Sequence, residues 1–123
     1  MASEYCAKQL LAAIVESDEL KKYDPESVPS PNDVKTALKE GFLKLDETMR
    51  KRPEVERGED KSGSTAVAVL ISPNHYFFAN CGDSRAILIS NGSPALHLIS
   101  PTPTFIVLYW NKIFIPVVLL ALF

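Results

Sequence analysis

The sequence has little cysteine, no excess of basic residues and no basic, apolar leader. Its two cysteines, Cys6 and Cys81, form no CxxC pair and no disulfide framework, so we expect two reduced thiols. The formal net charge of −2 provides no positive field for nucleic acid, and we expect no nucleic-acid partner. The missing leader favours an intracellular protein, cytoplasmic or nuclear.

Acidic residues are absent after Asp83. All 15 acidic residues lie at or before this position, and after it only Arg85 and Lys112 add formal charge. The 123 residues have room for one small domain. We therefore divide the chain into a domain over residues 1–100 and a divergent apolar tail over residues 101–123.

Two helices are expected in the first half of the chain. Apolar residues recur at helical spacing over residues 3–15. A second helix is expected from Ser30 and Pro31, because Ser30 can cap it and proline suits its first turn. Its apolar stripe is typical of a helix that packs on a sheet and consists of Val34, Leu38, Phe42, Leu45 and Met49.

Residues 65–90 predict three consecutive antiparallel strands. The first two are joined by a turn at residues 73–75, and the polar break Gly82-Asp83-Ser84-Arg85 separates the second from the third. Asn91-Gly92 is a hairpin signal that predicts a fourth strand near residues 95–99. The expected fold class is α+β, with an antiparallel sheet of three to four strands and two helices packed on one face.

Two motifs in this region resemble the protein phosphatase 2C family. They are Ser62-Gly63-Ser64-Thr65-Ala66 and Asn80-Cys81-Gly82-Asp83-Ser84-Arg85, in this order, at strand-length spacing and each followed by an apolar strand. Residues 4–8 and 41–46 also resemble two helices of that family, and the resemblance covers about residues 2–92. It implies an α-β-β-α sandwich and a metal-dependent protein serine/threonine phosphatase that uses Mg²⁺ or Mn²⁺ and acts on phosphoproteins.

The resemblance assigns one candidate metal ligand, Asp83, and no catalytic or other cofactor-binding residue. In the family, the two-metal centre also draws ligands from an upstream Glu, an Asp-Gly-His loop, and downstream Asp-Gly and Asp-Asn motifs. These have no counterpart in the 123 residues. One carboxylate does not hold a divalent ion tightly in water. We therefore expect a fragment of the phosphatase that is inactive alone, with weak or no metal binding.

A structural role for Asp83 remains open beside the metal role. The carboxylate could accept backbone N–H bonds in its turn or pair with Arg85. Much of the family's second sheet has no counterpart here. We therefore expect exposed apolar sheet surface, through which the chain could associate with itself.

Three interpretations compete for the tail. The run from Phe105 to Phe123 is interrupted only by Asn111, Lys112 and Pro116, and as a helix it would span about 28 Å. It could be a membrane anchor, although inserting Lys112 at the centre of a membrane helix costs roughly 2.5–3.5 kcal/mol. It could add strands or a helix to the domain. The loss of family pattern after residue 100 favours the third interpretation, a tail from a truncated or alternatively spliced message. A membrane-tethered, non-catalytic interaction module is the alternative function.

Overall fold

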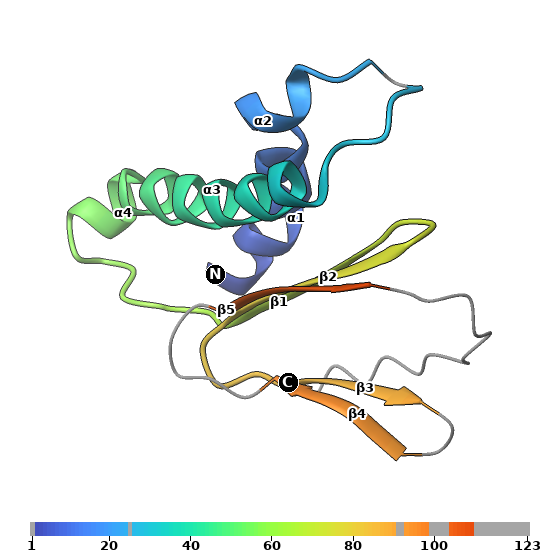
Figure 1. Ribbon diagram of the computed structural model, residues 1–123. Helices are drawn as coiled ribbons and strands as arrows, with labels where there is room; N and C mark the ends of the chain where they lie inside the picture. Colours follow the sequence, from blue (N-terminus) through green and yellow to red (C-terminus); the bar gives the residue numbers. More distant parts are fainter. Residues whose placement is uncertain (1, 25, 91–92, 99–103, 110–123) are drawn as a thin grey trace. The chain divides into compact units, whose positions relative to one another are not determined.

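A computed structural model describes residues 2–24, 26–90, 93–98 and 104–109 (Figure 1). The chain divides into two compact units, a helical unit over Met1–Ser64 and a strand unit over Thr65–Phe123. Together they confirm the predicted α+β fold class. The domain boundary placed at residue 100 stays a prediction.

The helical unit is built on two long helices. They are α1 (Ala2–Val15) and α3 (Pro31–Arg50), with the short helices α2 (Asp18–Lys21) and α4 (Pro53–Glu56) beside them. Both long helices were predicted from their periodicity. Their contact buries Ile14 of α1 against α3, where Gly41 lies so close that an added Cβ would meet the Ile14 Cγ1 atom at 2.6 Å. Glycine is required there by close helix packing.

The strand unit contains two antiparallel sheets. The first has the order β1-β2-β5, from β1 (Ala66–Ile71), β2 (His75–Cys81) and β5 (Thr104–Tyr109). The second pairs β3 (Ala86–Ser90) with β4 (Ser93–Leu98). The hairpin between β1 and β2 closes through Ser72, whose N–H donates to the His75 carbonyl at 2.9 Å.

The division into two sheets is a detail that the sequence pattern did not predict. We expected the strands to form one sheet, but β3 pairs with β4 and the second neighbour of β2 is β5. The polar break at residues 82–85 therefore carries the chain from one sheet to the other. The predicted fourth strand is confirmed as β4.

Residues 104–109 of the apolar tail form β5, which runs antiparallel to β2 from His75↔Tyr109 to Asn80↔Thr104. For these six residues the structure shows a strand added to the domain. Residues 110–123 lie outside the described part of the chain, so association of the tail with a membrane stays a prediction. Within the described ranges no helix is long and apolar enough to cross a bilayer.

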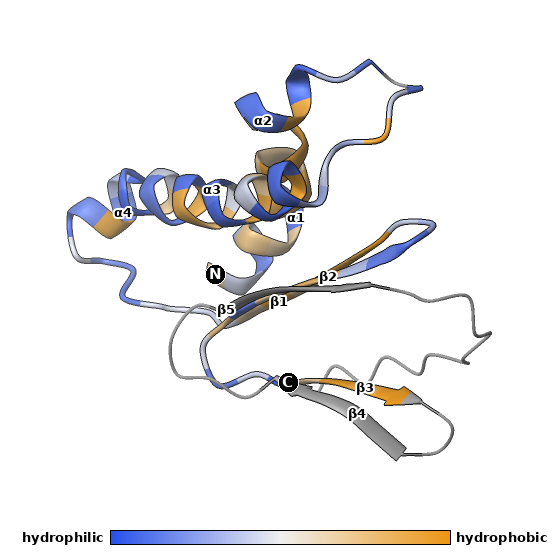
Figure 2. Ribbon diagram, viewed as in Figure 1, coloured by the Kyte–Doolittle hydropathy of each residue, from blue (hydrophilic) through white to orange (hydrophobic). Residues whose placement is uncertain are grey.

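Apolar side chains join the two sheets. Tyr76 and Phe78 of β2 form a buried cluster with Ala86 of β3, and Val67, Val69 and Leu88 pack against it. Figure 2 shows that β3 is apolar, whereas the long helices carry both apolar and hydrophilic residues. Because alternate strand residues share a face, Asn80 lies on the same face of β2 as Tyr76 and Phe78. This layer ends at the turn that holds Asp83.

Candidate functional site

The turn from β2 to β3 carries Asp83, the predicted metal ligand. Asp83 and Arg85 are exposed, whereas Ser84 between them and Ala86 after them are buried. Alternation of the backbone therefore directs the Asp83 carboxylate to the solvent at the end of β2. His75 lies at the opposite end of the same strand and takes no part in this turn.

Gly82 shapes the turn through its backbone conformation. Its φ is +99°, a region that residues with a Cβ rarely adopt. An added Cβ would also lie 2.6 Å from the Thr65 Cγ2 atom. Gly82 thus meets two requirements at once, a left-handed backbone and close contact with the residue that precedes β1.

A pair of hydroxyl groups links the β2–β3 turn to the residue before β1. The Thr65 Oγ1 and Ser84 Oγ atoms lie 2.6 Å apart, and Ser84 is 9% exposed. Thr65 belongs to the first motif and Ser84 to the second. The two motifs that the sequence separates by a hairpin are therefore in direct contact in the folded strand unit.

The carboxylate of Asp83 is available to a ligand. In the part of the chain that the structure describes, no ion pair joins Asp83 to Arg85, so the pairing considered from the sequence is not found. Across those same residues, no three His, Cys, Asp or Glu side chains gather into a metal cluster. One exposed carboxylate fits a hydrated Mg²⁺ or Mn²⁺ that keeps most of its waters, and it does not fit two tightly held ions.

Asn80 is the first residue of the second motif, and we gave it no role of its own from the sequence. It is fully buried, at 0% exposure, and neither polar atom of its side-chain amide has a hydrogen-bond partner among the described residues. The available signal was a polar side chain directly after the apolar run Tyr76-Phe77-Phe78-Ala79, within the same strand. It lies in β2, two residues before Gly82.

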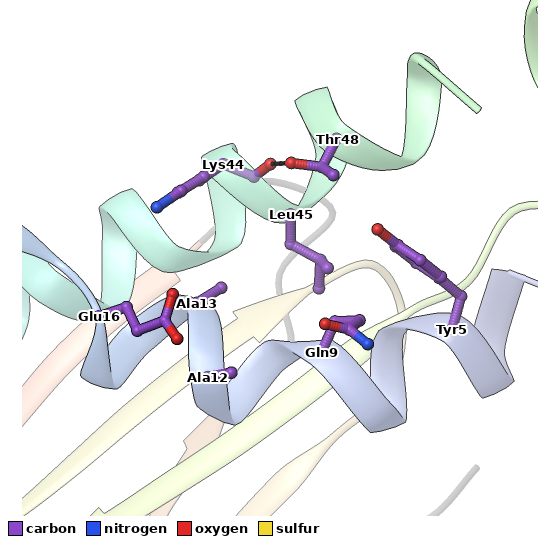
Figure 3. A pocket seen from close by; sticks show the side chains of 8 residues that line it. All are labelled: Tyr5, Gln9, Ala12, Ala13, Glu16, Lys44, Leu45 and Thr48. Atoms are coloured by element: carbon purple, nitrogen blue, oxygen red, sulfur yellow. Dashed lines mark hydrogen bonds between the residues drawn. The ribbon is translucent and has the colours of Figure 1, made fainter.

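The helical unit contains a shallow groove of about 230 Å³ between α1 and α3 (Figure 3). Its base includes Ala12, Ala13 and Leu45, and Glu16 and Lys44 lie toward one end. The Thr48 hydroxyl on its wall donates to the Lys44 carbonyl at 2.7 Å. These residues form no titratable cluster suited to catalysis, and we assign the groove no chemistry.

The two cysteines are free thiols, as predicted. Burial raises the pKa of the Cys6 thiol, and the nearby Asp46 carboxylate adds to this increase. The Cys6 Sγ atom lies 3.9 Å from the Met49 Sδ atom. A raised pKa lowers the thiolate fraction, so Cys6 is not an activated nucleophile.

Comparison with known proteins gives one consistent result. The family model described as Protein phosphatase 2C matches residues 1–102. Protein phosphatase 1B of Rattus norvegicus is 46% identical over 93 residues, which cover 73% of this chain and 24% of the relative. Protein phosphatase 1A of Homo sapiens is 46% identical over 89 residues, covering 72% and 23%. The chain spans about a quarter of the length of these curated relatives.

Proposed function

Because this chain belongs to the protein phosphatase 2C family, we propose that it forms part of a metal-dependent phosphatase acting on phosphoserine and phosphothreonine in proteins. The observation that supports this most is the contact between the two family motifs. The Thr65–Ser84 hydroxyl pair and the glycine at position 82 present Asp83 to solvent at one end of the strand unit.

Asp83 is the residue that we propose for holding the metal. Its carboxylate offers the hard oxygen ligand that Mg²⁺ and Mn²⁺ prefer, and its exposure leaves space for the waters such ions retain. When bound, the family's divalent ions lower the pKa of a coordinated water and neutralise phosphoryl oxygens. Thr65, Gly82 and Ser84 contribute by holding the turn.

We further propose that the 123-residue polypeptide alone does not hydrolyse phosphate esters. A binuclear hydrolytic site needs acidic ligands from several loops, and the resemblance matches one of them, Asp83. We expect no turnover of p-nitrophenyl phosphate or a phosphothreonine peptide by the purified chain in millimolar Mn²⁺. The matched control is Asp83→Ala, which should give the same background. Turnover that this substitution abolishes would overturn the proposed inactivity.

A further inference from the structure

We propose that β1 pairs with β1 of a second copy of this chain, along the edge that faces away from β2. The inference is independent of metal binding and of catalysis. Among the strands that the structure describes, β1 lies at the end of the order β1-β2-β5 and has β2 as its one neighbour. Such an edge strand presents a row of backbone N–H and C=O groups that a further strand can bind.

The hairpin turn shows which residues of β1 direct their backbone groups to this edge. The Ser72 N–H donates to the His75 carbonyl at 2.9 Å, so these two residues form a hydrogen-bonded pair of the ladder. Bonded and non-bonded pairs alternate along an antiparallel ladder. The backbone groups that point to β2 therefore belong to Ala66, Ala68 and Leu70. Those that point away from β2 belong to Val67, Val69 and Ile71.

β1 lacks the features that usually protect an edge strand from another chain. Its sequence, Ala-Val-Ala-Val-Leu-Ile, contains no charged residue, no proline and no glycine. Charge is absent from the whole stretch between Ser62 and Asn74, so two paired copies would bring no like charges together here. Ile71, at the end of β1, is 64% exposed. An exposed, apolar and uncharged edge is a typical site of association between strands.

One antiparallel register pairs all three outward-facing residues, and this favours a second copy as the partner. With Val69 opposite Val69 of the other copy, Val67 lies opposite Ile71, and each pair can exchange two backbone hydrogen bonds. A shift by two residues in either direction would leave one of the three opposite a residue outside β1. The same register sets small Ala68 opposite large Leu70 on the other face of the strand.

Side-chain packing supports this register. Val67 and Val69 pack against the buried cluster of β2 and β3. Because alternate residues of a strand share a face, Ile71 of the second copy would continue that apolar layer beside Val67. The pairing is the same on both copies, so it closes into a two-fold dimer and does not continue into a fibre.

The area of the interface sets its strength. Pairing over the 6 residues of β1 buries less than the roughly 1,200 Å² of a standard interface, which is typical of weak association. We expect a dissociation constant on the order of 100 µM. At a few micromolar, where the stability of a single chain is measured, the protein should be monomeric.

The test is amide hydrogen exchange of the full 123-residue chain at about 5 µM and about 1 mM, quenched and read residue by residue by NMR. At the lower concentration Val67, Val69 and Ile71 should exchange rapidly. At the higher concentration their exchange should slow about fivefold, because mass action leaves about a fifth of the chains monomeric. Glu26, in the exposed loop between α2 and α3, is the internal control and should exchange equally at both concentrations.

Ile71→Pro tests the surface directly. It removes an N–H that points away from β2, so the bonds of the hairpin are kept, and proline is tolerated on the unpaired side of an edge strand. Its dissociation constant, from sedimentation equilibrium, should be at least about 10-fold larger than that of the unsubstituted chain. Ile71→Ala is the matched control, because it shortens the same exposed side chain and keeps the N–H, and it should still dimerise. Thermal unfolding at about 5 µM shows whether both variants fold.

Each other result would overturn the proposal. Protection of Val67, Val69 and Ile71 at both concentrations would mean that another segment of the same chain, such as residues 110–123, occupies this edge. Rapid exchange at both concentrations, or equal dimerisation of Ile71→Pro and Ile71→Ala, would show that β1 is not the interface. Aggregates larger than a dimer would contradict the two-fold register. None of these results bears on the proposed phosphatase function, which the assay with Asp83→Ala tests separately.

Discussion

Asn80 shows how a single residue departs from the chemistry around it. Its neighbours on the same face of β2 are Tyr76 and Phe78, and its cross-strand partner on β1 is Val67. A buried amide without hydrogen bonds costs about 1–3 kcal/mol for each unpaired group. An aliphatic side chain would avoid that cost. The Asn80 amide therefore lowers the free energy of unfolding of the described strand unit.

We predict that Asn80→Leu raises the free energy of unfolding of the 123-residue chain by about 1 kcal/mol, because it removes an amide that has no partner among the described residues and keeps the branched four-atom shape, while its larger methyl groups offset part of the gain. Urea unfolding followed by circular dichroism measures the change. Asn80→Ala is the matched control, since it also removes the amide but leaves a cavity and should gain less. A loss of stability in Asn80→Leu would show that the amide has a partner.

The residues of the site were predictable to different degrees. Asp83 could be nominated from the sequence because the two motifs together resemble the family and carboxylates are metal ligands, and its metal role stays a prediction. The sequence could not show that Thr65 meets Gly82 and Ser84, because this contact depends on the register of a hairpin. Likewise, the lack of a partner for Asn80 depends on what packs around it, which no local pattern reveals.

At the scale of elements, the start of α3 is stabilised both by its own capping residue and by residues of the preceding segment. The Ser30 hydroxyl accepts from the Asp33 N–H at 3.2 Å, which is the cap that the sequence predicted. Two residues that follow α2 also contact Asp33: the Tyr23 hydroxyl donates to the Asp33 carboxylate, and the Lys22 Nζ atom lies 3.2 Å from a carboxylate oxygen. These bonds, led by the one from Tyr23, lower the pKa of Asp33 from 3.8 to about 2.

The lowered pKa predicts a change of stability in acid. A carboxylate whose pKa is depressed by folding stabilises the protein above its unfolded pKa, and this contribution is lost as the pH falls through about 2. Asp33→Asn should therefore be less stable than the unsubstituted chain at pH 6, and the gap should narrow by pH 2.5. Urea unfolding at both pH values measures it.

The control for this prediction is Glu40→Gln, which changes an exposed carboxylate on the same helix. It should leave stability almost unchanged at pH 6. A gap between Asp33→Asn and the unsubstituted chain that stays constant from pH 6 to pH 2.5 would contradict the role assigned to the Asp33 charge.

The strands were predictable one by one, but their neighbours were not. Alternating and continuous apolar runs located β1, β2 and β3, because burial of the side chains follows the strand period. The same period does not say which edge a strand pairs with. The chain leaves the first sheet at the Gly82 turn, where φ is +99°, and the place beside β2 is taken by β5 from the tail.

At the scale of the whole molecule, the strand unit depends on residues beyond the family match. That match ends at residue 102, whereas β5 begins at Thr104. β2 is the central strand of its sheet, and its residues 76–80 are all buried. Without β5, one backbone edge of this buried strand would have no partner within the described sheet, which is a costly state and a common start of aggregation.

We therefore predict that a chain ending at residue 103 is less stable than one ending at residue 109, by about 3 kcal/mol or more, because it loses the ladder from His75↔Tyr109 to Asn80↔Thr104. The chain ending at 109 is the matched control, since it removes residues 110–123 and keeps β5. Thermal unfolding by circular dichroism measures stability, and sedimentation velocity should detect association of the shorter chain only. If both truncated chains unfolded at the same temperature and stayed monomeric, β5 would be a dispensable addition, and its apolar sequence would need another explanation.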